Sequence, residues 1–300
     1  MRLLNNTNID FISKTKFTLF LSLGIILLGI GSLIVNKGPK LSIDFVGGTV
    51  IQVSTSKIIG INQVRNLLDG TILKASEVTE ITGLNANQQF RIKTNLKIDD
   101  TTEISYTIFQ SLIDYEPEIR AIESVGPKVG RELQFQAVYA IGLALLMLMI
   151  YIGFRFDQFY AMGSVVAIAH DILITLGIFS LLNLEINLSI IAAFLTIVGY
   201  SLNDTIVIFD RFRENSQKDL KLSLIELANL SLNQTMSRTI ITSLTTLMVV
   251  IILFFVGGEV IKYFAFALII GVIVGTYSSI FIASPFMLYF KSKIKVEEEE

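Results

Sequence analysis

Six long stretches of apolar residues dominate this chain, and they constrain its fold more than any other feature. A helix needs roughly 20 apolar residues to cross the hydrocarbon core of a bilayer. The stretches that qualify are residues 17–35, 135–154, 159–182, 188–209, 239–256 and 263–290. Hydrophobic residues make up 52% of the 300 and charged residues only 17%, which is too apolar for a soluble globular protein. The sequence therefore predicts an α-helical polytopic membrane protein with six transmembrane helices.

Basic residues beside the predicted spans indicate which helix ends are cytoplasmic, because Lys and Arg are enriched in cytoplasmic loops. The turn 183–187 has no Lys or Arg, and the turn after span five has only Lys262. The opposite side carries Arg2, Lys14, Lys16, Arg155, Arg211, Arg213, Lys218, Lys221, Arg238, Lys291, Lys293 and Lys295. We therefore expect both termini, residues 1–16 and 291–300, to be cytoplasmic. The first span is too long for the apolar part of a signal peptide, so we expect an uncleaved anchor.

Residues 36–134 form the one long segment between spans, and this segment falls on the outer side. Its patterns predict α+β structure in the order strand, helix, strand, strand, helix, strand. The expected ranges are 49–55, 61–68, 77–81, 89–94, 101–115 and 118–125, with a turn at 83–87 and a helix cap at Asp99 or Asp100. This βαββαβ order is typical of a ferredoxin-like domain. The segment has no histidine and no glycine-rich phosphate loop, which favours a binding or mechanical role over an enzymatic one.

Composition excludes several classes of site. The chain has no cysteine, so disulfides, thiol chemistry and thiolate metal sites are impossible. A single histidine rules out a histidine-rich metal site, and we expect neither metal nor cofactor. The net charge of −2 argues against nucleic acid as a partner.

Two glycine-containing linkers flank the predicted outer domain. LSIDFVGGT, residues 41–49, contains Asp44, Gly47 and Gly48. The glycine pair either supplies backbone freedom, for positive φ or for close approach of another chain, or forms a plain turn. ESVGPKVGREL, residues 123–133, leads into the second span and is punctuated by Gly126, Pro127 and Gly130. It is either a hinge or an exit loop.

One polar stretch interrupts the fourth span. GYSLNDTIVIFDR, residues 199–211, places Asn203 and Asp204 beyond a long apolar run, with Tyr200 and Ser201 about one helical turn earlier. An ionisable group inside a bilayer costs several kcal/mol unless it is paired or hydrated, so Asp204 is a candidate functional residue. The alternative is that the span ends early and Asp204 meets headgroup water. The apolar residues 206–209 weaken that alternative.

Two other spans carry ionisable residues. His170 and Asp171 lie near the middle of the third span, as either a functional site or a mutually satisfied structural pair. Adjacent residues on a helix point about 100° apart, so we expect these two to have different partners. Arg238 opens the fifth span, either as an ordinary cytoplasmic flank or as a counter-ion to Asp204 across a close helix interface.

These residues suit proton movement better than covalent chemistry. An aspartate held between an apolar environment and a cation can take a proton from one side of a membrane and release it to the other. Each charge that crosses the field is worth about 2.3 kcal/mol per 100 mV. The pattern therefore predicts a proton relay in a helix bundle, with no catalytic residue.

The motifs resemble those of one protein family. LSIDFVGG after the first span, ESVGPKVGREL before the second, AHD in the third and GYSLNDTIVIFDRFREN in the fourth are similar to SecF members of the SecD/SecF family, in the resistance-nodulation-division superfamily. The likeness covers essentially the whole chain, and the fourth-span motif is the specific one. It implies a periplasmic ferredoxin-like domain and a multi-pass location in the bacterial inner membrane.

The resemblance also implies partners and roles. SecF subunits pair with a homologous partner, SecD, and associate with the SecYEG channel and, in some species, YajC. The complex uses the proton gradient to draw preproteins outward after SecA has driven them through the channel with ATP. The family's proton-pathway carboxylate falls on Asp204 and its arginine on Arg238, while His170 and Asp171 lie in another of the family's motifs.

Two alternatives stay open at this point. A related chain could form half of a small-molecule or lipid exporter, although those proteins commonly carry larger outer domains. A passive scaffold of a translocation complex is the other alternative, and costly buried charge argues against it.

Overall fold

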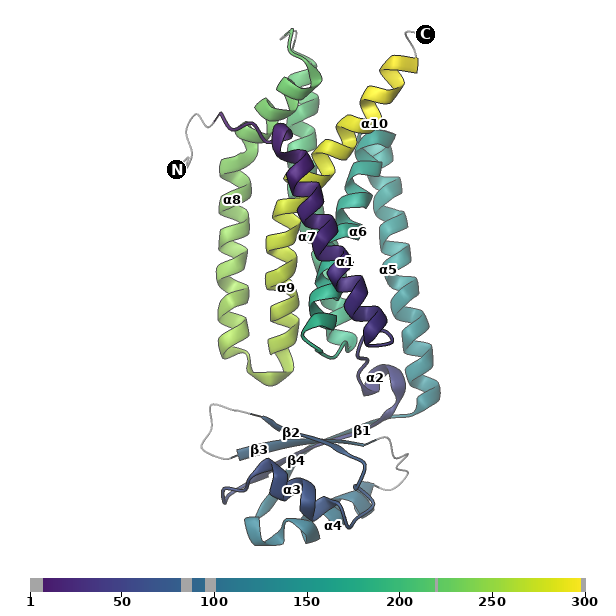
Figure 1. The fold of residues 1–300 in the computed structure, drawn as a ribbon, viewed down its shortest axis with the longest axis vertical. Helices are drawn as coiled ribbons and strands as arrows, with labels where there is room; N and C mark the ends of the chain where they lie inside the picture. The colour runs from purple at the N-terminus through teal and green to yellow at the C-terminus, as the bar shows by residue number, and fades with distance from the viewer. Residues whose placement is uncertain (1–7, 82–87, 95–100, 219–220, 298–300) are drawn as a thin grey trace. The chain divides into compact units, whose positions relative to one another are not determined.

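The computed structural model of the chain describes residues 8–81, 88–94, 101–218 and 221–297. The expected turn at 83–87, the helix cap at Asp99 or Asp100, and Arg2 lie outside these residues. The chain divides into two compact units, one of residues 1–40 and 138–300 and the other of residues 41–137. The first is a helix bundle and the second contains a small sheet (Figure 1).

The helix bundle accounts for all six apolar stretches. Six helical segments are long and apolar enough to cross a membrane. They are built from η1 (Ile12–Lys14), α1 (Thr15–Val35), α5 (Pro127–Arg155), α6 (Gln158–Leu181), α7 (Leu188–Ser216), α8 (Leu224–Val256), α9 (Gly258–Ser278), the π-helical η3 (Ser279–Ala283) and α10 (Ser284–Glu297). The beginning of α1 and the whole of α10 lie at the same end of the bundle (Figure 1).

Two helices differ from the expected spans in ways that matter for the site. The fifth-span helix α8 begins at Leu224, well before the apolar stretch, because Ser223 and Glu226 form a reciprocal capping box at its first turn. The sixth span is not one regular helix: η3 interrupts it with π-helical turns between α9 and α10. Short π-helical insertions shift the register of a helix and are frequent at functional sites.

Glycines allow the helices of the bundle to approach closely. A Cβ on Gly29 of α1 would lie 2.7 Å from the Cα of Gly177 on α6, so the two backbones touch at that point. A Cβ on Gly271 of α9 would collide with the side chain of Ile197 on α7. Small residues at helix interfaces are the usual means of close packing in membranes, where lipid offers no hydrophobic driving force. Close packing here brings α1, α6, α7 and α9 together around the polar residues described below.

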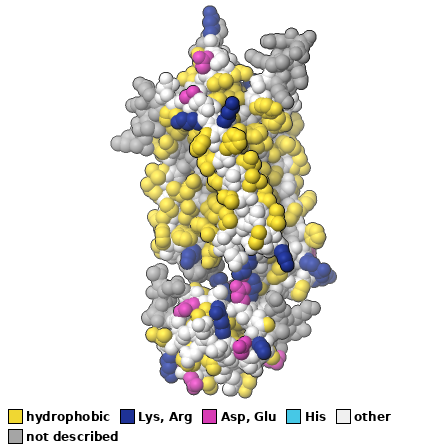
Figure 2. Space-filling model, in the orientation of Figure 1, with side chains coloured by type: hydrophobic (Ala, Val, Ile, Leu, Met, Phe, Trp, Pro, Cys, Tyr) yellow, Lys and Arg dark blue, Asp and Glu magenta, His cyan; other side chains and the backbone are white. Residues whose placement is uncertain are grey.

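The outer surface of the bundle is apolar. Hydrophobic side chains cover much of its visible face in Figure 2. Only 11% of the most apolar window of α5, and the same share for α8, is buried inside the chain, against 56% for α6. The helices α5 and α8 therefore present most of their apolar surface to the surroundings of the bundle.

In its described residues, the second unit is a four-stranded sheet accompanied by two longer helices and two short helical segments. Its elements are α2 (Ile43–Val46), β1 (Gly48–Thr55), α3 (Ile61–Leu68), β2 (Glu77–Ile81), β3 (Gln88–Thr94), α4 (Thr101–Ser111), η2 (Ile113–Tyr115) and β4 (Pro117–Val125). The strand order is β2-β3-β1-β4 and every neighbouring pair is antiparallel, as in a ferredoxin-like fold. Alternate residues of β1 and β3, among them Ile51, Val53 and Phe90, are fully buried against α3 and α4. The expected fold class is confirmed.

The two linker motifs pack against each other within this unit. Gly47 has φ +79°, and a Cβ there would lie 2.9 Å from the Cα of Pro127, the first residue of α5. A Cβ on Gly130 would lie 2.7 Å from the carbonyl oxygen of Phe45, which also accepts a hydrogen bond from Gln134. Gly48, with φ +130°, begins β1. The segment that precedes β1 and the segment that follows β4 are thereby held in contact.

The remaining linker residues sit at the ends of these elements. Asp44 lies in the first turn of α2, where its backbone N–H donates to the side chain of Ser42. Gly126 precedes α5, and its carbonyl oxygen accepts the N–H of Gly130. A Cβ on Gly126 would meet no atom within 4 Å. Pro127 then opens the helix, a position where proline is favoured because its missing N–H is not needed there.

Buried acidic clusters of the helix bundle

Asp204 is buried on α7 and faces α8. Asp204 is only 4% exposed. Its two carboxylate oxygens accept hydrogen bonds from Thr242 and Ser243, each at 3.4 Å. Ser243 also shares a hydrogen bond of 2.6 Å with Thr276 of α9. The fourth span does not end before Asp204, since α7 continues to Ser216. Two hydroxyl groups of α8 thus contact the carboxylate, and one of them is linked to α9.

Arg238 does not touch this carboxylate. Its residue is exposed on α8, and within the described chain it forms no ion pair with Asp204, although it lies close enough to interact electrostatically. Thr242 and Ser243 follow Arg238 by one turn and supply the nearest contacts instead. The arrangement differs from a direct counter-ion contact and leaves Arg238 as a longer-range positive charge.

The two other polar residues of the stripe point elsewhere. Asn203 is exposed on the outer surface of α7. Tyr200 is half-buried, and its hydroxyl has no hydrogen-bond partner among the described residues. Consecutive residues on a helix face different directions, so Asn203 turns outward where Asp204 turns inward.

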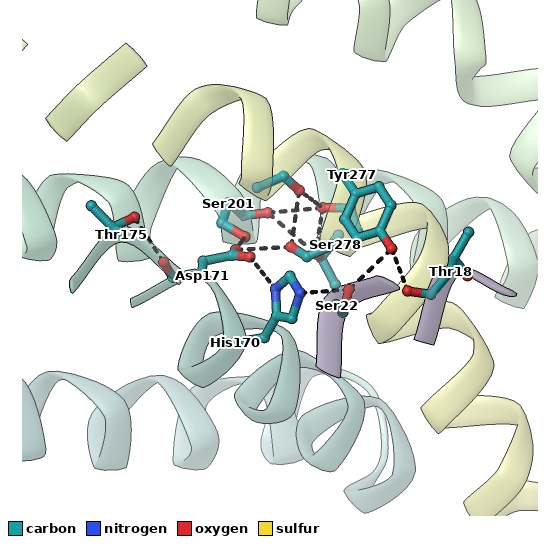
Figure 3. A network of polar contacts seen from close by, with 11 residues as sticks. Thr18, Ser22, His170, Asp171, Thr175, Ser201, Tyr277 and Ser278 are labelled. Carbon is teal, nitrogen blue, oxygen red and sulfur yellow. Dashed lines mark hydrogen bonds and ion pairs between the residues drawn. The ribbon is translucent and has the colours of Figure 1, made fainter. Parts of the chain in front are cut away.

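Asp171 is the centre of a second cluster, shown in Figure 3. Its carboxylate is completely buried on α6. One oxygen, Oδ2, accepts the hydroxyl of Ser201 of α7 at 2.6 Å and that of Ser278 of α9 at 2.8 Å. The other oxygen, Oδ1, lies 2.9 Å from Nδ1 of His170. A buried carboxylate with this many donors is fully satisfied by hydrogen bonds.

His170 extends the second cluster to α1. Its Nε2 lies 3.0 Å from Oγ of Ser22, which in turn lies 3.0 Å from the hydroxyl of Tyr277. The Tyr277 hydroxyl donates to the backbone oxygen of Thr18 at 2.7 Å (Figure 3). His170 and Asp171 have different partners on the facing helices, as expected, and their side chains also contact each other.

The two clusters share helices α7 and α9. Ser201, which bonds Asp171, lies about one turn before Asp204 on α7. On α9, Thr276 contacts Ser243 of the Asp204 cluster, while Ser278 contacts Asp171. A displacement of either helix therefore changes the surroundings of both carboxylates.

Several residues of the second cluster carry no signal in the sequence. Thr18 and Ser22 are isolated hydroxyl residues within an apolar span, and Tyr277 and Ser278 belong to the run TYSS, residues 276–279. Hydroxyl residues in helices often bond only their own helix backbone. Their positions on facing helices, and not their spacing in the chain, bring them together. Among the described residues, no group of three or more His, Asp or Glu side chains could hold a metal ion.

Two family profiles match the chain. The profile of the C-terminal part of the protein export membrane proteins SecD and SecF matches residues 105–293, and that of the SecD/SecF GG motif matches residues 32–57. The first match covers Asp204, His170 and Asp171, and the second covers the linker with Gly47 and Gly48. The chain belongs to the SecD/SecF family. Its six apolar helices make it a multi-pass membrane member of that family.

Curated members of the SecD/SecF family resemble the chain over nearly its full length. Protein translocase subunit SecF of Thermodesulfovibrio yellowstonii is 43% identical, with 96% of each chain covered. Its counterpart in Calditerrivibrio nitroreducens is 42% identical over the same shares. Protein translocase subunit SecDF of Thermus thermophilus is 40% identical over 87% of this chain but only 36% of its own length.

Solved structures of SecDF have the same fold. The crystal structure of SecDF from Thermus, described as a translocon-associated membrane protein, superposes with a TM-score of 0.85 at 37% identity. A structure of SecDF in a super-membrane-facing form gives a TM-score of 0.73. The chain spans about two fifths of these solved chains, 39% and 40% respectively.

Proposed function

We propose that this chain is the SecF-type subunit of a bacterial protein-export complex, in which proton binding at Asp204 drives conformational work on a preprotein. The full-length likeness to protein translocase SecF subunits supports the assignment to export. The likeness also disfavours the alternative of a small-molecule or lipid exporter. The observation that carries the proton role is the burial of Asp204 among hydroxyl groups inside an apolar bundle.

Protonation of Asp204 changes the charge of a buried helix interface. A charged carboxylate there needs its hydroxyl donors from α8, and the positive charge of Arg238 favours it from a distance. The neutral acid needs fewer donors and tolerates a looser interface. Alternate loading from one side and release to the other would therefore shift α7 against α8. No covalent intermediate and no catalytic residue are required.

The proposed partner is a SecD subunit. A homologue that carries the SecF-like part within one longer SecDF chain supports a permanent pairing of the two parts. Most of the apolar surface of α5 and α8 is not buried within this chain and is available to further transmembrane helices. Asn203 is exposed on α7 beside Asp204, and a polar side chain at that depth is costly against lipid tails. A SecD helix packed over Asn203 would remove that cost.

We place the complex in the bacterial inner membrane, with both termini in the cytoplasm. The basic residues of the short segments between helices, such as Arg155, Arg211 and Arg213, lie on the same side of the spans as Lys14 and Lys16, and basic loops stay in the cytoplasm. The outer domain, residues 41–137, then faces the periplasm. Association with SecYEG, and with YajC in some species, follows from the family resemblance.

Vesicles that contain this chain, its cognate SecD, SecYEG and SecA test the proposal. After ATP-driven insertion of a preprotein, a proton gradient is imposed and completion of translocation is followed. We expect Asp204→Asn and Arg238→Ala each to abolish the gradient-dependent part, while the complex still assembles.

The matched control is Asp210→Asn on the same helix. Asp210 is half exposed and pairs with Arg155 at 3.4 Å, outside both buried clusters. It should leave gradient dependence unchanged. If Asp204→Asn also left it unchanged, the chain would be a passive scaffold and the proton role would be lost.

A further inference from the structure

A series of hydrogen bonds runs from Asp171 to Thr18. Donors and acceptors can be assigned in only one way if each of its contacts from Thr18 to His170 is to contain a hydrogen. The Tyr277 hydroxyl donates its single hydrogen to the backbone oxygen of Thr18. At the 3.0 Å contact between Ser22 and Tyr277, the hydrogen must then come from Ser22. Ser22 has no second hydrogen to give, so its contact with His170 requires a hydrogen on Nε2.

The other ring nitrogen of His170 faces a carboxylate. Nδ1 lies 2.9 Å from Oδ1 of Asp171. Two hydroxyls, from Ser201 and Ser278, donate to the other oxygen of Asp171, which favours its negative charge. A carboxylate acceptor needs a hydrogen on Nδ1 as well. With a charged Asp171, both ring nitrogens carry hydrogens and His170 is an imidazolium; with the proton on Oδ1 of Asp171, the same contacts hold a neutral ring, and the measurement below separates the two states.

We propose that His170 and Asp171 form a second proton-binding site of the bundle, with Ser22 and Tyr277 as its route to water at the Thr18 end of α1. The inference rests on the proposed proton-driven function and adds a site to it. Thr18 lies within one turn of the start of α1, beside the basic residues Lys14 and Lys16. That end of the bundle is the one assigned to the cytoplasm.

In proton release along this route, a water molecule is the final acceptor. The Nε2 proton passes to Oγ of Ser22, the Ser22 proton passes to the Tyr277 oxygen, and the Tyr277 proton passes to a cytoplasmic water molecule. The pair changes from neutral to a single negative charge, which a buried site tolerates poorly. Release at this site therefore has to be followed by reprotonation or by movement of α1, α6, α7 or α9.

The groups around the imidazole support a titrating site. Among the described residues, the titratable side chains that contact it are Asp171 and Tyr277, whose ring stacks on it at 6.0 Å between centroids. The other polar contacts of the pair are hydroxyls: Ser22 of α1 contacts the imidazole, and Ser201 of α7 and Ser278 of α9 contact Asp171. The π-helical turns of η3 begin directly after Ser278, so the ring of hydroxyls lies beside a helix segment able to shift register.

The protonation state can be measured directly, because His170 is the only histidine of the chain. The full chain, labelled with ring-15N histidine and carrying an affinity tag without histidine, is placed in lipid bilayers. Solid-state nitrogen NMR separates imidazolium from the two neutral tautomers. We expect both ring nitrogens to be protonated at pH 7. A neutral ring at that pH would overturn the proposal.

Tyr277→Phe separates a proton route from simple packing. The phenyl ring keeps the stack on His170 and the contact with Phe281, but Ser22 becomes able to donate to Nε2. The ratio of imidazolium to neutral ring at pH 7 should then fall roughly tenfold, the effect of one net hydrogen bond. Tyr160→Phe, which removes a buried hydroxyl of α6 near Lys291, should leave the ratio unchanged. An unchanged ratio in Tyr277→Phe would also overturn the proposal.

The vesicle assay distinguishes this inference from the proposed function. We expect His170→Gln and Tyr277→Phe to lose at least half of the gradient-dependent translocation, with Tyr160→Phe unaffected. If they translocate like wild type while Asp204→Asn is inactive, the second site is excluded and the function of Asp204 stands. If Asp204→Asn is itself fully active, the proposed function fails, whatever the NMR result.

Discussion

The hydroxyl of Ser201 donates a hydrogen bond of 2.6 Å to Oδ2 of Asp171, which joins α7 to the centre of α6. Asp204 lies about one turn farther along α7, so the same short segment of helix holds one carboxylate and supports the other. Motion of that segment is the simplest way for proton binding at one site to affect the second.

Ser201→Ala should destabilise the bundle, because it leaves a buried carboxylate with one donor fewer. We expect a loss of about 1–3 kcal/mol in the free energy of unfolding. Unfolding in mixed micelles of increasing SDS, followed by circular dichroism, measures this quantity. Thr196→Ala is the control on the same helix, since Thr196 is exposed and its hydroxyl bonds only the Ala192 carbonyl. Equal stability of the two variants would argue against the Ser201 bond as a support of Asp171.

Gly29→Ala should separate α1 from α6. The added Cβ would lie 2.7 Å from the Cα of Gly177, a backbone atom that cannot move alone. Overpacking of this kind costs about 1–3 kcal/mol. The separation should also weaken the 2.8 Å hydrogen bond between Ser32 and Ser180. Thermal unfolding in detergent measures the loss, and Gly24→Ala, at an open position of the same helix, should show none.

Gly47→Ala should loosen the junction of the outer domain. The residue has φ +79°, and its new Cβ would meet the backbone of Pro127 at 2.9 Å. We expect faster cleavage of this domain in limited proteolysis of the membrane-embedded chain. Gly126→Ala adds the same methyl group in the second linker, where no atom lies within 4 Å. Equal protease resistance of both variants would return Gly47 to the role of a plain turn.

The sequence predicts the elements of this fold better than their mutual contacts. The helix predicted at 61–68 is observed at the same residues, and the βαββαβ order is correct. These features follow from local periodicity, which the chain carries along its own length. The contact between Gly47 and Pro127 joins residues far apart in sequence, and a single chain gives no pattern from which to infer it.

For the candidate site too, the sequence identifies individual residues better than the contacts between them. Asp204, His170 and Asp171 are visible in the sequence because ionisable residues are rare inside apolar spans. Of the two alternatives for Arg238, a direct ion pair with Asp204 is not formed among the described residues, where the hydroxyls of Thr242 and Ser243 contact the carboxylate. The early start of α8 had a signal, a Ser followed three residues later by Glu, that marks a capping box.

Acid should release the N-terminal segment from α8. Hydrogen bonds from the backbone N–H of Ser13 and the side chain of Asn229 lower the pKa of Asp10 below its ordinary value. Because this pKa is lower in the folded chain, the stabilisation is present above the unfolded pKa of about 3.9 and is lost as pH falls through the folded value. Asn233 of α8 also hydrogen-bonds the backbone N–H and the backbone oxygen of Ile9, so two asparagines of α8 hold the N-terminal segment.

A nitroxide spin label reports this release. The chain has no cysteine, so Ile9→Cys provides a single attachment site. The label should be immobilised near neutral pH and become mobile below about pH 4, the range in which Asp10 takes up a proton. Asp10→Asn should give the same mobility at every pH. A label whose mobility still depended on pH in Asp10→Asn would place the titrating group elsewhere.

Proton movement itself tests the proposed coupling most directly. Vesicles that hold the complete export complex and an enclosed pH-sensitive dye are supplied with a preprotein and a proton gradient, and the translocation-dependent proton flux is recorded. Wild type and Asp210→Asn should show the same flux, whereas Asp204→Asn should show none above the background leak. A flux in Asp204→Asn equal to that of wild type would contradict the assignment of Asp204 as the proton-binding residue.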